Sequence, residues 1–216
     1  MAMVFVYKTK EYQFVFSVML VYAVYQLVEN TPLYAVDSLV YALVGILYIG
    51  FAYAFRNHTF IEKVFRLTSG AVSFLAFIYI TYESILIQDQ SSSWLLLAAY
   101  VVIMVNYLVL SNVTKYVIFT YLAPVFFFVS MAQLWDLTQT GPWFFFLYTA
   151  ASLLFLYGGI WTKVKWLQVL KDSNLYTSLF VLTGCLYYAL YDLQYGYSAI
   201  MLLTVSLLSY FVKKSS

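Results

Sequence analysis

Long apolar runs separated by short polar breaks cover almost the whole chain. Eight of these runs approach the roughly 20 apolar residues that a helix needs to cross a bilayer, and polar, proline and glycine residues lie between them, where they begin or end helices. The pattern predicts an all-α protein, a polytopic transmembrane helical bundle of eight helices. The expected spans are Tyr12–Val28, Leu33–Phe55, Leu67–Ile87, Trp94–Leu110, Tyr116–Trp135, Trp143–Trp161, Leu175–Tyr191 and Tyr197–Val212.

The composition supports a membrane protein. Hydrophobic residues make up 64% of the 216 residues and charged residues only 9%, whereas a soluble domain carries about 25% charged residues. Because so few polar groups cannot cover a water-exposed surface, we expect the lipid bilayer to be the main partner. The net charge of +2 and the absence of a basic stripe argue against a nucleic acid partner.

The basic residues predict the orientation. All 11 Lys and Arg residues fall on one side of the predicted map, and such an excess marks the cytoplasmic side, so both termini are expected in the cytoplasm. The longest loops, 56–66 and 162–174, mix basic and apolar residues. We expect them to be either amphipathic helices on the membrane surface or extensions of the spans. A membrane or cytoplasmic protein partner would find its contact surface here.

The sequence also bears on the compartment. Low cysteine use and compact loops favour a bacterial plasma membrane. The C-terminal residues Lys213 and Lys214 resemble a dilysine retrieval signal, which keeps the endoplasmic reticulum open as the alternative. The plainer interpretation of the two lysines is the positive flank of the last span.

Several residues recur at a constant spacing in the two halves of the chain. The matches are Lys8 with Lys115, Gln26 with Gln133, Glu29 with Asp136 and Arg56 with Lys163. Halves 1–110 and 111–216 would then hold four helices each in the same orientation, which is a 4+4 parallel internal repeat. The alternative is a single membrane domain without duplication, because every membrane hairpin needs Lys inside and polar residues outside.

Acidic residues gather near the helix ends opposite the basic ones. Asp37 and Glu83 are expected a few residues inside their spans, where a carboxylate is costly unless it faces the bundle interior or water. With neighbouring Tyr and Gln residues they predict an outward-facing vestibule for a cation, because carboxylates supply charge and Tyr rings supply cation–π faces. Ordinary interface polarity with local hydrogen bonds is the alternative. The candidate ligand-binding residues are Tyr25, Gln26, Asp37, Tyr82, Glu83, Gln133, Tyr191 and Asp192.

A few other positions inside the spans have structural predictions. Asn106 is expected to make a hydrogen bond between helices, and Pro124 is expected to kink its helix and to free a backbone carbonyl near Thr120. Gly45 and Gly184 are expected where helices pack closely.

Catalytic signatures are missing from the sequence. The only histidine, His58, is expected in a loop and the only cysteine, Cys185, in mid-membrane, so they do not form a nucleophile–base pair. No hydrolase, zinc-protease or P-loop motif is present, and we expect no cofactor and no metal. The sequence predicts a small permease-like or ligand-binding membrane protein for a cationic small molecule or ion. The alternative is a non-transporting sensor module or accessory subunit; an enzyme with Asp37 and Glu83 as acid and base is least favoured.

Overall fold

The computed structural model describes residues 10–87, 93–114, 116–138, 141, 143–161, 168–191 and 195–215. Within these ranges the chain forms eight α-helices and one 3-10 helix and no β-strand, which confirms the predicted all-α class. In chain order the elements are α2 (Lys10–Glu29), η1 (Pro32–Val36), α3 (Asp37–Ala54), α4 (Thr59–Ile87), α5 (Ser93–Thr114), α6 (Val117–Thr138), α7 (Trp143–Trp161), α9 (Lys171–Tyr191) and α10 (Tyr195–Ser215).

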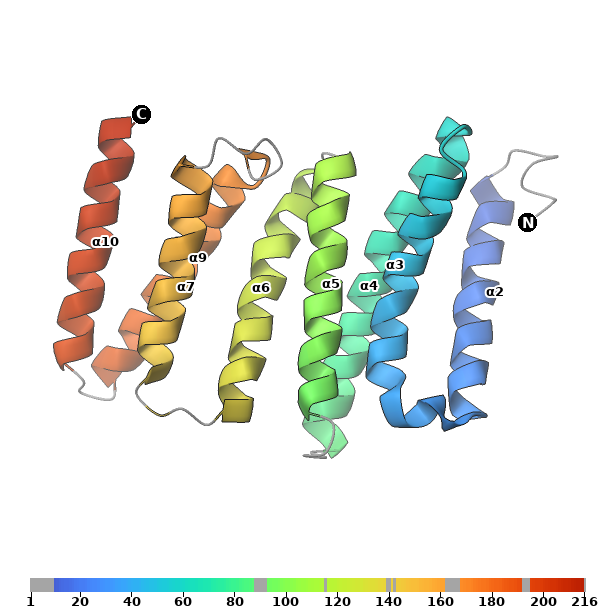
Figure 1. Cartoon of the computed structure of the whole chain (residues 1–216), viewed down its shortest axis with the longest axis horizontal. Coiled ribbons are helices and arrows are strands. Elements are labelled where there is room, and N and C mark those ends of the chain that lie inside the picture. Colours follow the sequence, from blue (N-terminus) through green and yellow to red (C-terminus); the bar gives the residue numbers. More distant parts are fainter. Residues whose placement is uncertain are drawn as a thin grey trace. The chain divides into compact units, whose positions relative to one another are not determined.

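The helices group into two compact units of four. The N-terminal unit ends at Thr114 and contains α2 to α5, and the C-terminal unit begins at Lys115 and contains α6 to α10. Inside each unit consecutive helices run in opposite directions (Figure 1). The boundary between the units lies close to the boundary between the two halves suggested by the sequence. The duplication itself stays a prediction.

Five of the described helices contain stretches that are long and apolar enough to cross a membrane, and these stretches are Glu11–Glu29, Pro32–Ala54, Thr59–Ser84, Trp94–Thr114 and Val117–Thr138. Shorter apolar stretches occur in α7 and α10. α9 differs because it begins with the polar sequence Lys171-Asp172-Ser173-Asn174. The chain is therefore compatible with a multi-pass membrane protein, while the eight-span topology and the orientation stay predictions.

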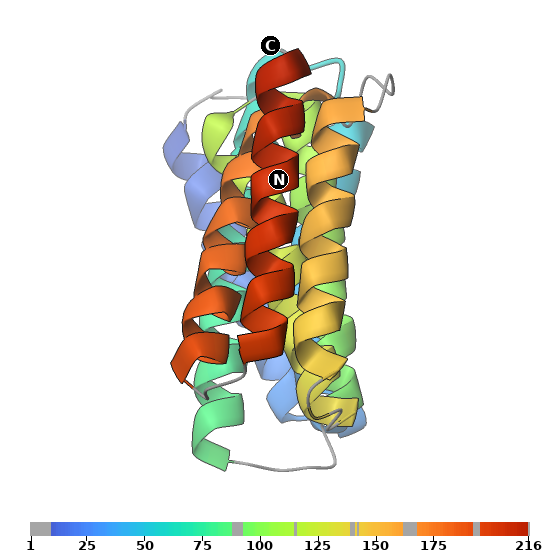
Figure 2. The same cartoon turned by 90° about the vertical axis from the view of Figure 1, so that its left-hand side faces the viewer.

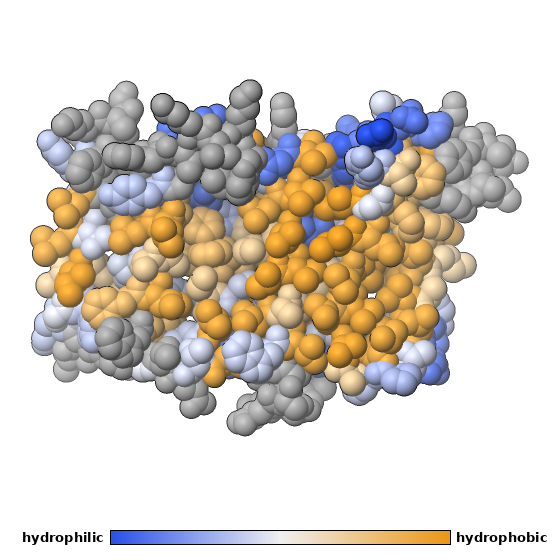
Figure 3. Space-filling model, viewed as in Figure 1, coloured by the Kyte–Doolittle hydropathy of each residue, from blue (hydrophilic) through white to orange (hydrophobic). Residues whose placement is uncertain are grey.

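The surface of the N-terminal unit agrees with such a setting. Hydrophobic side chains cover the visible sides of its helices, and hydrophilic residues lie toward their ends (Figure 3). Large apolar residues point outward along single helices, as Phe14 and Met19 do on α2 with 69% and 63% of their surface exposed. Soluble monomers rarely expose apolar patches larger than a few hundred Å². In a bilayer, lipid tails would cover this surface, so its exposure would carry no hydrophobic free-energy cost.

The third predicted span begins much earlier than expected. α4 starts at Thr59 rather than at Leu67, so the loop 56–66 largely forms a helix extension, one of the two alternatives. The apolar spacing explains the extension, because Ile61 and Phe65 stand one turn apart and both are buried against α3. The expected span starts after the last charge and therefore leaves out this buried stripe. Of the other long loop, residues 162–167 lie outside the described residues, and α9 begins at Lys171, before the expected Leu175.

The second predicted span also divides in two. Thr31 caps the 3-10 helix η1 by accepting a hydrogen bond from the backbone N–H of Leu33, and Pro32 occupies its first turn. The regular α-helix begins only at Asp37, whose Oδ1 accepts the backbone N–H of Ser38. Asp is a preferred residue at helix starts because its carboxylate satisfies exposed N–H groups. This turn brings the end of α2 and the start of α3 to the same end of the unit.

The core of the N-terminal unit is the packing of α3 against both α4 and α5. Asn106 of α5 is completely buried and donates hydrogen bonds to the hydroxyl groups of Ser69 at 3.0 Å and Ser73 at 2.6 Å, both on α4. Ser69 in turn donates to the carbonyl of Gly45 on α3 at 2.7 Å. These contacts confirm the interhelical role predicted for Asn106. They join three helices through one polar centre.

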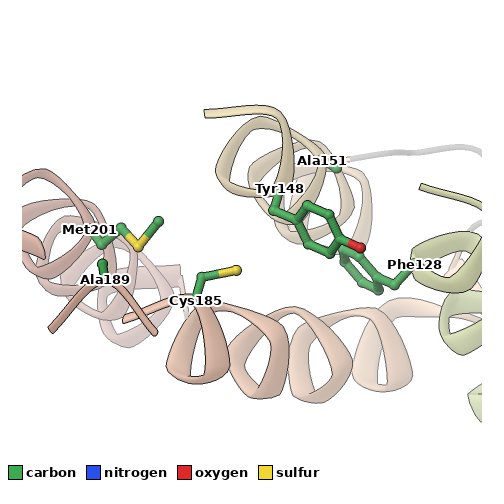
Figure 4. Close-up of a cluster of buried hydrophobic side chains, with 6 residues drawn as sticks. All are labelled: Phe128, Tyr148, Ala151, Cys185, Ala189 and Met201. Atoms are coloured by element: carbon green, nitrogen blue, oxygen red, sulfur yellow. The ribbon is translucent and has the colours of Figure 1, made fainter. Parts of the chain in front are cut away.

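In the C-terminal unit α9 packs against α6, α7 and α10, and Figure 2 shows α7, α9 and α10 running side by side. Their interface is mainly hydrophobic. Figure 4 shows the Phe128 ring beside the Tyr148 ring, with Cys185 and Met201 in the same cluster. Pro124 lies inside α6, which continues through it. Because proline has no N–H, it cannot bond the Thr120 carbonyl; the kink stays a prediction.

The two glycines predicted to allow close packing behave differently. A Cβ atom on Gly45 would lie 1.9 Å from Ser73 Oγ and 2.9 Å from Asn106 Nδ2, so the close approach of α3, α4 and α5 requires glycine there. A Cβ atom on Gly184 in α9 would meet nothing within 4 Å. The prediction for Gly184 is therefore wrong, because this glycine lies on a side of α9 that no helix approaches within the described part of the chain.

Candidate cation-binding site

The end of the N-terminal unit where α2 and α3 connect brings three acidic residues together. Glu29 is the last residue of α2 and Asp37 the first residue of α3. α4 returns to the same end and carries Glu83 one turn before its last residue, Ile87. Two of these positions are helix termini, so the positions of the charges follow directly from where the helices begin and end.

The carboxyl groups of Asp37 and Glu83 interact with each other, and Glu29 adds a third negative charge that also acts on Glu83. The Oε2 atom of Glu83 is shielded from solvent and has no hydrogen-bond partner within the described chain. Two carboxylates that meet in this way repel each other unless a proton or a cation lies between them. The pair therefore has an unsatisfied preference for positive charge.

Two tyrosines stand beside this acidic pair. Tyr41 follows Asp37 by one turn on α3, and Tyr79 precedes Glu83 by one turn on α4. Their ring centroids are 5.0 Å apart and the rings meet edge to face at 80°. The Tyr41 hydroxyl is shielded from solvent and has no hydrogen-bond partner among the described residues. An aromatic face and a free hydroxyl oxygen next to carboxylates are suited to an organic cation or a weakly hydrated ion.

The other predicted members from this unit contribute less. Tyr25 of α2 interacts electrostatically with Tyr41, which places it at the edge of the site. Gln26 is exposed, and its amide accepts a hydrogen bond from Asn30 and donates to Tyr22 within α2. Tyr82 has 64% of its surface exposed, although it directly precedes Glu83. The structure brings neither Gln26 nor Tyr82 into contact with the acidic pair.

The remaining predicted members belong to the C-terminal unit. Gln133 is half-buried on α6, and Tyr191 is the last residue of α9 with 77% of its surface exposed. Asp192 lies outside the described residues. The site described here is therefore built from α2, α3 and α4 of the N-terminal unit.

The sequence-based prediction missed Tyr41, Tyr79 and the contribution of Glu29. A usable signal was present, because Asp37 with Tyr41 and Tyr79 with Glu83 both have the four-residue spacing that places two side chains on one helix face. Tyrosines directly adjacent to the acids in sequence, such as Tyr82, were chosen instead. Adjacent residues on a helix point about 100° apart, so sequence neighbours of a buried acid rarely line the same site.

Among the described residues no group of three or more His, Cys, Asp or Glu side chains is arranged to hold a metal ion. The carboxyl groups of Asp37 and Glu83, together with Glu29, supply negative charge but few ligand atoms for a metal ion. This arrangement is suited to a singly charged cation.

Comparison with protein-family models, with curated proteins and with solved structures gives no match for this chain.

Proposed function

We propose that the chain is an integral membrane protein whose N-terminal unit binds a small, singly charged cation, as in the binding step of a permease-like protein. The membrane part of the proposal is supported by the apolar helices of suitable length and by the outward-facing apolar side chains such as Phe14 and Met19. The binding part is supported by the acidic site at one end of α2, α3 and α4.

The observation that carries the proposal is that Asp37 and Glu83 interact with each other, while no described basic side chain lies beside them. The basic residues described in this unit, such as Arg56, Lys63 and Arg66, belong to the opposite ends of α3 and α4. A pair of carboxyls that holds one proton carries one negative charge, and one bound monovalent cation neutralises it. The rings of Tyr41 and Tyr79 favour a cation with organic character.

Cation binding to the purified full chain tests this proposal. Isothermal titration in mild detergent, with tetramethylammonium and Na⁺ as separate probes, compares wild type with Asp37→Asn and Glu83→Gln. Each variant removes one carboxylate and keeps the side-chain shape, and the amide oxygen of the substituted asparagine can still accept the backbone N–H of Ser38 as Asp37 does. We expect affinity for the preferred probe to fall at least tenfold, equivalent to about 1.4 kcal/mol.

Asp136→Asn is the matched control, because Asp136 is an exposed acid near the end of α6 in the other unit. It is expected to bind the probe as wild type does. Equal affinities for wild type and both site variants, with the helical circular dichroism unchanged, would contradict the proposal.

A second candidate function is a non-transporting sensor module or accessory subunit. It is favoured by the place of the carboxyls, because Asp37 begins α3 and Glu83 lies near the end of α4, not in the middle of either helix. Ion-coupled transporters keep ionisable groups near the bilayer midplane. Uptake of the preferred cation into proteoliposomes distinguishes the two: uptake lost in Glu83→Gln supports a permease, while binding without uptake supports a sensor.

A further inference from the structure

The end of the N-terminal unit opposite the acidic site carries exposed positive charge. Arg56 lies in the connection between α3 and α4, and Lys63 lies in the second turn of α4; both are exposed. We call these two residues the basic patch. Figure 3 shows hydrophilic surface over this end of the unit, bordering the hydrophobic sides of the helices.

A nearby third cation already has partners. Arg66 forms an ion pair with Glu62 one turn earlier on α4 and donates a hydrogen bond of 3.3 Å to the carbonyl of Val113 near the end of α5. The pair neutralises Glu62, the acid closest in sequence to Lys63. Among the described residues, the other acid at this end of the unit is Glu11, which is exposed in the first turn of α2. The basic patch therefore keeps most of its charge for an external partner.

The Arg56 side chain is held against the ring of Tyr53. Its guanidinium carbon lies 5.1 Å from the centroid of the Tyr53 ring, and its Nη1 donates to the Tyr53 hydroxyl at 3.4 Å. A guanidinium has five N–H donors, so most of them stay available while the ring restricts its motion. Tyr53 itself is 70% exposed, and an exposed Tyr beside a cation is typical of the membrane interface.

The position of the basic patch relative to the apolar stretches indicates the kind of partner it would meet. The apolar stretches Pro32–Ala54 and Thr59–Ser84 end on either side of the α3–α4 connection. If these helices cross the bilayer, the connection lies at the level of the lipid headgroups. The only negative groups that a bilayer itself supplies at this level are the phosphates and other anionic parts of its lipids.

We propose that the basic patch binds the headgroup of an anionic phospholipid, with Arg56 and Lys63 both contacting the phosphate. This inference rests on the proposed membrane location and is independent of the cation site. An interfacial basic residue contributes about fivefold to the affinity for an anionic lipid, so the two together contribute about 25-fold.

Native mass spectrometry of the full chain in mild detergent tests the inference. The protein is titrated with phosphatidylglycerol or with phosphatidylcholine, and wild type is compared with Arg56→Gln, Lys63→Gln and the double variant. We expect wild type to prefer phosphatidylglycerol, each single variant to lose about fivefold and the double variant about 25-fold. Lys171→Gln, which removes an exposed cation from the start of α9 in the other unit, is the control and is expected to change less than twofold.

Three results would overturn the inference. The first is equal binding of both lipids by wild type, and the second is unchanged phosphatidylglycerol binding by the double variant. The third is displacement of phosphatidylglycerol by inorganic phosphate at the same concentration, which would indicate a site for soluble anions. Flotation with vesicles of phosphatidylcholine shows whether only the lipid site is wrong or the proposed membrane location is wrong as well. A chain that does not enter membranes at all stays at the bottom of the gradient.

Discussion

The two units differ in the hydrogen bonds described between their helices. In the N-terminal unit the buried Asn106 and Ser69 are joined across helices by hydrogen bonds, and Tyr107 of α5 donates to the Gly70 carbonyl of α4 at 2.7 Å. In the C-terminal unit the hydroxyl groups of Ser152 on α7 and Ser178 on α9 are fully buried and have no hydrogen-bond partner among the described residues. The first unit thus has described hydrogen bonds that join its helices, although the side-chain amide atoms of its buried Gln13 also have no described partner.

The contacts between helices also differ between the two units. Gly45 lets α3 approach α4 and α5 so closely that side-chain oxygens of one helix reach the backbone of another. In the C-terminal unit rings fill the interfaces, with Phe127 and Phe155 centroids 4.0 Å apart. Small residues allow hydrogen bonds between helices that large ones prevent. Gly45 therefore allows the hydrogen-bonded contact among α3, α4 and α5.

The largest expected effect comes from adding one methyl group at this glycine. Gly45→Ala places a Cβ atom 1.9 Å from Ser73 Oγ, so Ser73 must rotate away and its bond from Asn106 is lost. Overpacking of a tight core costs typically 1–3 kcal/mol, and we expect about 3 kcal/mol here because a buried hydrogen bond is lost as well. The measurement is the free energy of unfolding in mixed micelles.

The matched control lies on the same helix. A Cβ atom on Gly50 would meet nothing within 4 Å, so Gly50→Ala adds helix propensity without a clash and is expected to be neutral or to stabilise by up to about 1 kcal/mol. Gly184→Ala in the C-terminal unit is expected to behave like Gly50→Ala. Equal stability of Gly45→Ala and Gly50→Ala would show that the polar centre does not need the close approach.

A smaller loss is expected from removing the amide itself. Asn106→Ala breaks the bonds to Ser69 and Ser73, and hydrogen bonds between membrane helices contribute about 0.6 kcal/mol on average and up to about 1.7. We expect a loss of about 1–2 kcal/mol in the same unfolding assay. The double variant Asn106→Ala with Ser73→Ala should lose little more than Asn106→Ala alone. Additive losses would indicate that the two side chains act independently.

Hydropathy was sufficient to predict most of the fold. Each of the eight apolar runs contains an α-helix, because a long apolar run with polar ends has few other structures available to it. The errors lie where local chemistry changed a boundary. Thr31 and Pro32 favour a 3-10 turn before α3, and the buried residues Ile61 and Phe65 extend α4 toward its N-terminus. These details depend on side-chain packing that a hydropathy average does not record.

The site was less predictable than the helices. Asp37 and Glu83 were identified because an acid within an apolar run is rare, and the structure places them side by side. Their aromatic neighbours Tyr41 and Tyr79 depend on which face of each helix points inward, and with 23 tyrosines in the chain composition does not single them out. Residues such as Gln133 were grouped with the site by their helix-end positions alone, and such positions do not specify which helices are neighbours.

The smallest expected effect has the opposite sign and lies in the C-terminal unit. Ser178→Ala and Ser152→Ala each remove a buried hydroxyl that has no hydrogen-bond partner in the described part of the chain. Burying such a group carries a desolvation cost of about 1–3 kcal/mol, and the lost van der Waals contacts of the hydroxyl offset part of the gain. We therefore expect each variant to stabilise by up to about 1 kcal/mol, whereas Ser73→Ala in the N-terminal unit, which removes a bonded hydroxyl, should destabilise. Thermal unfolding of the three variants in the same detergent measures the contrast. If all three shift the midpoint downward, the C-terminal serines have partners, and the two units bury their polar groups by the same rule.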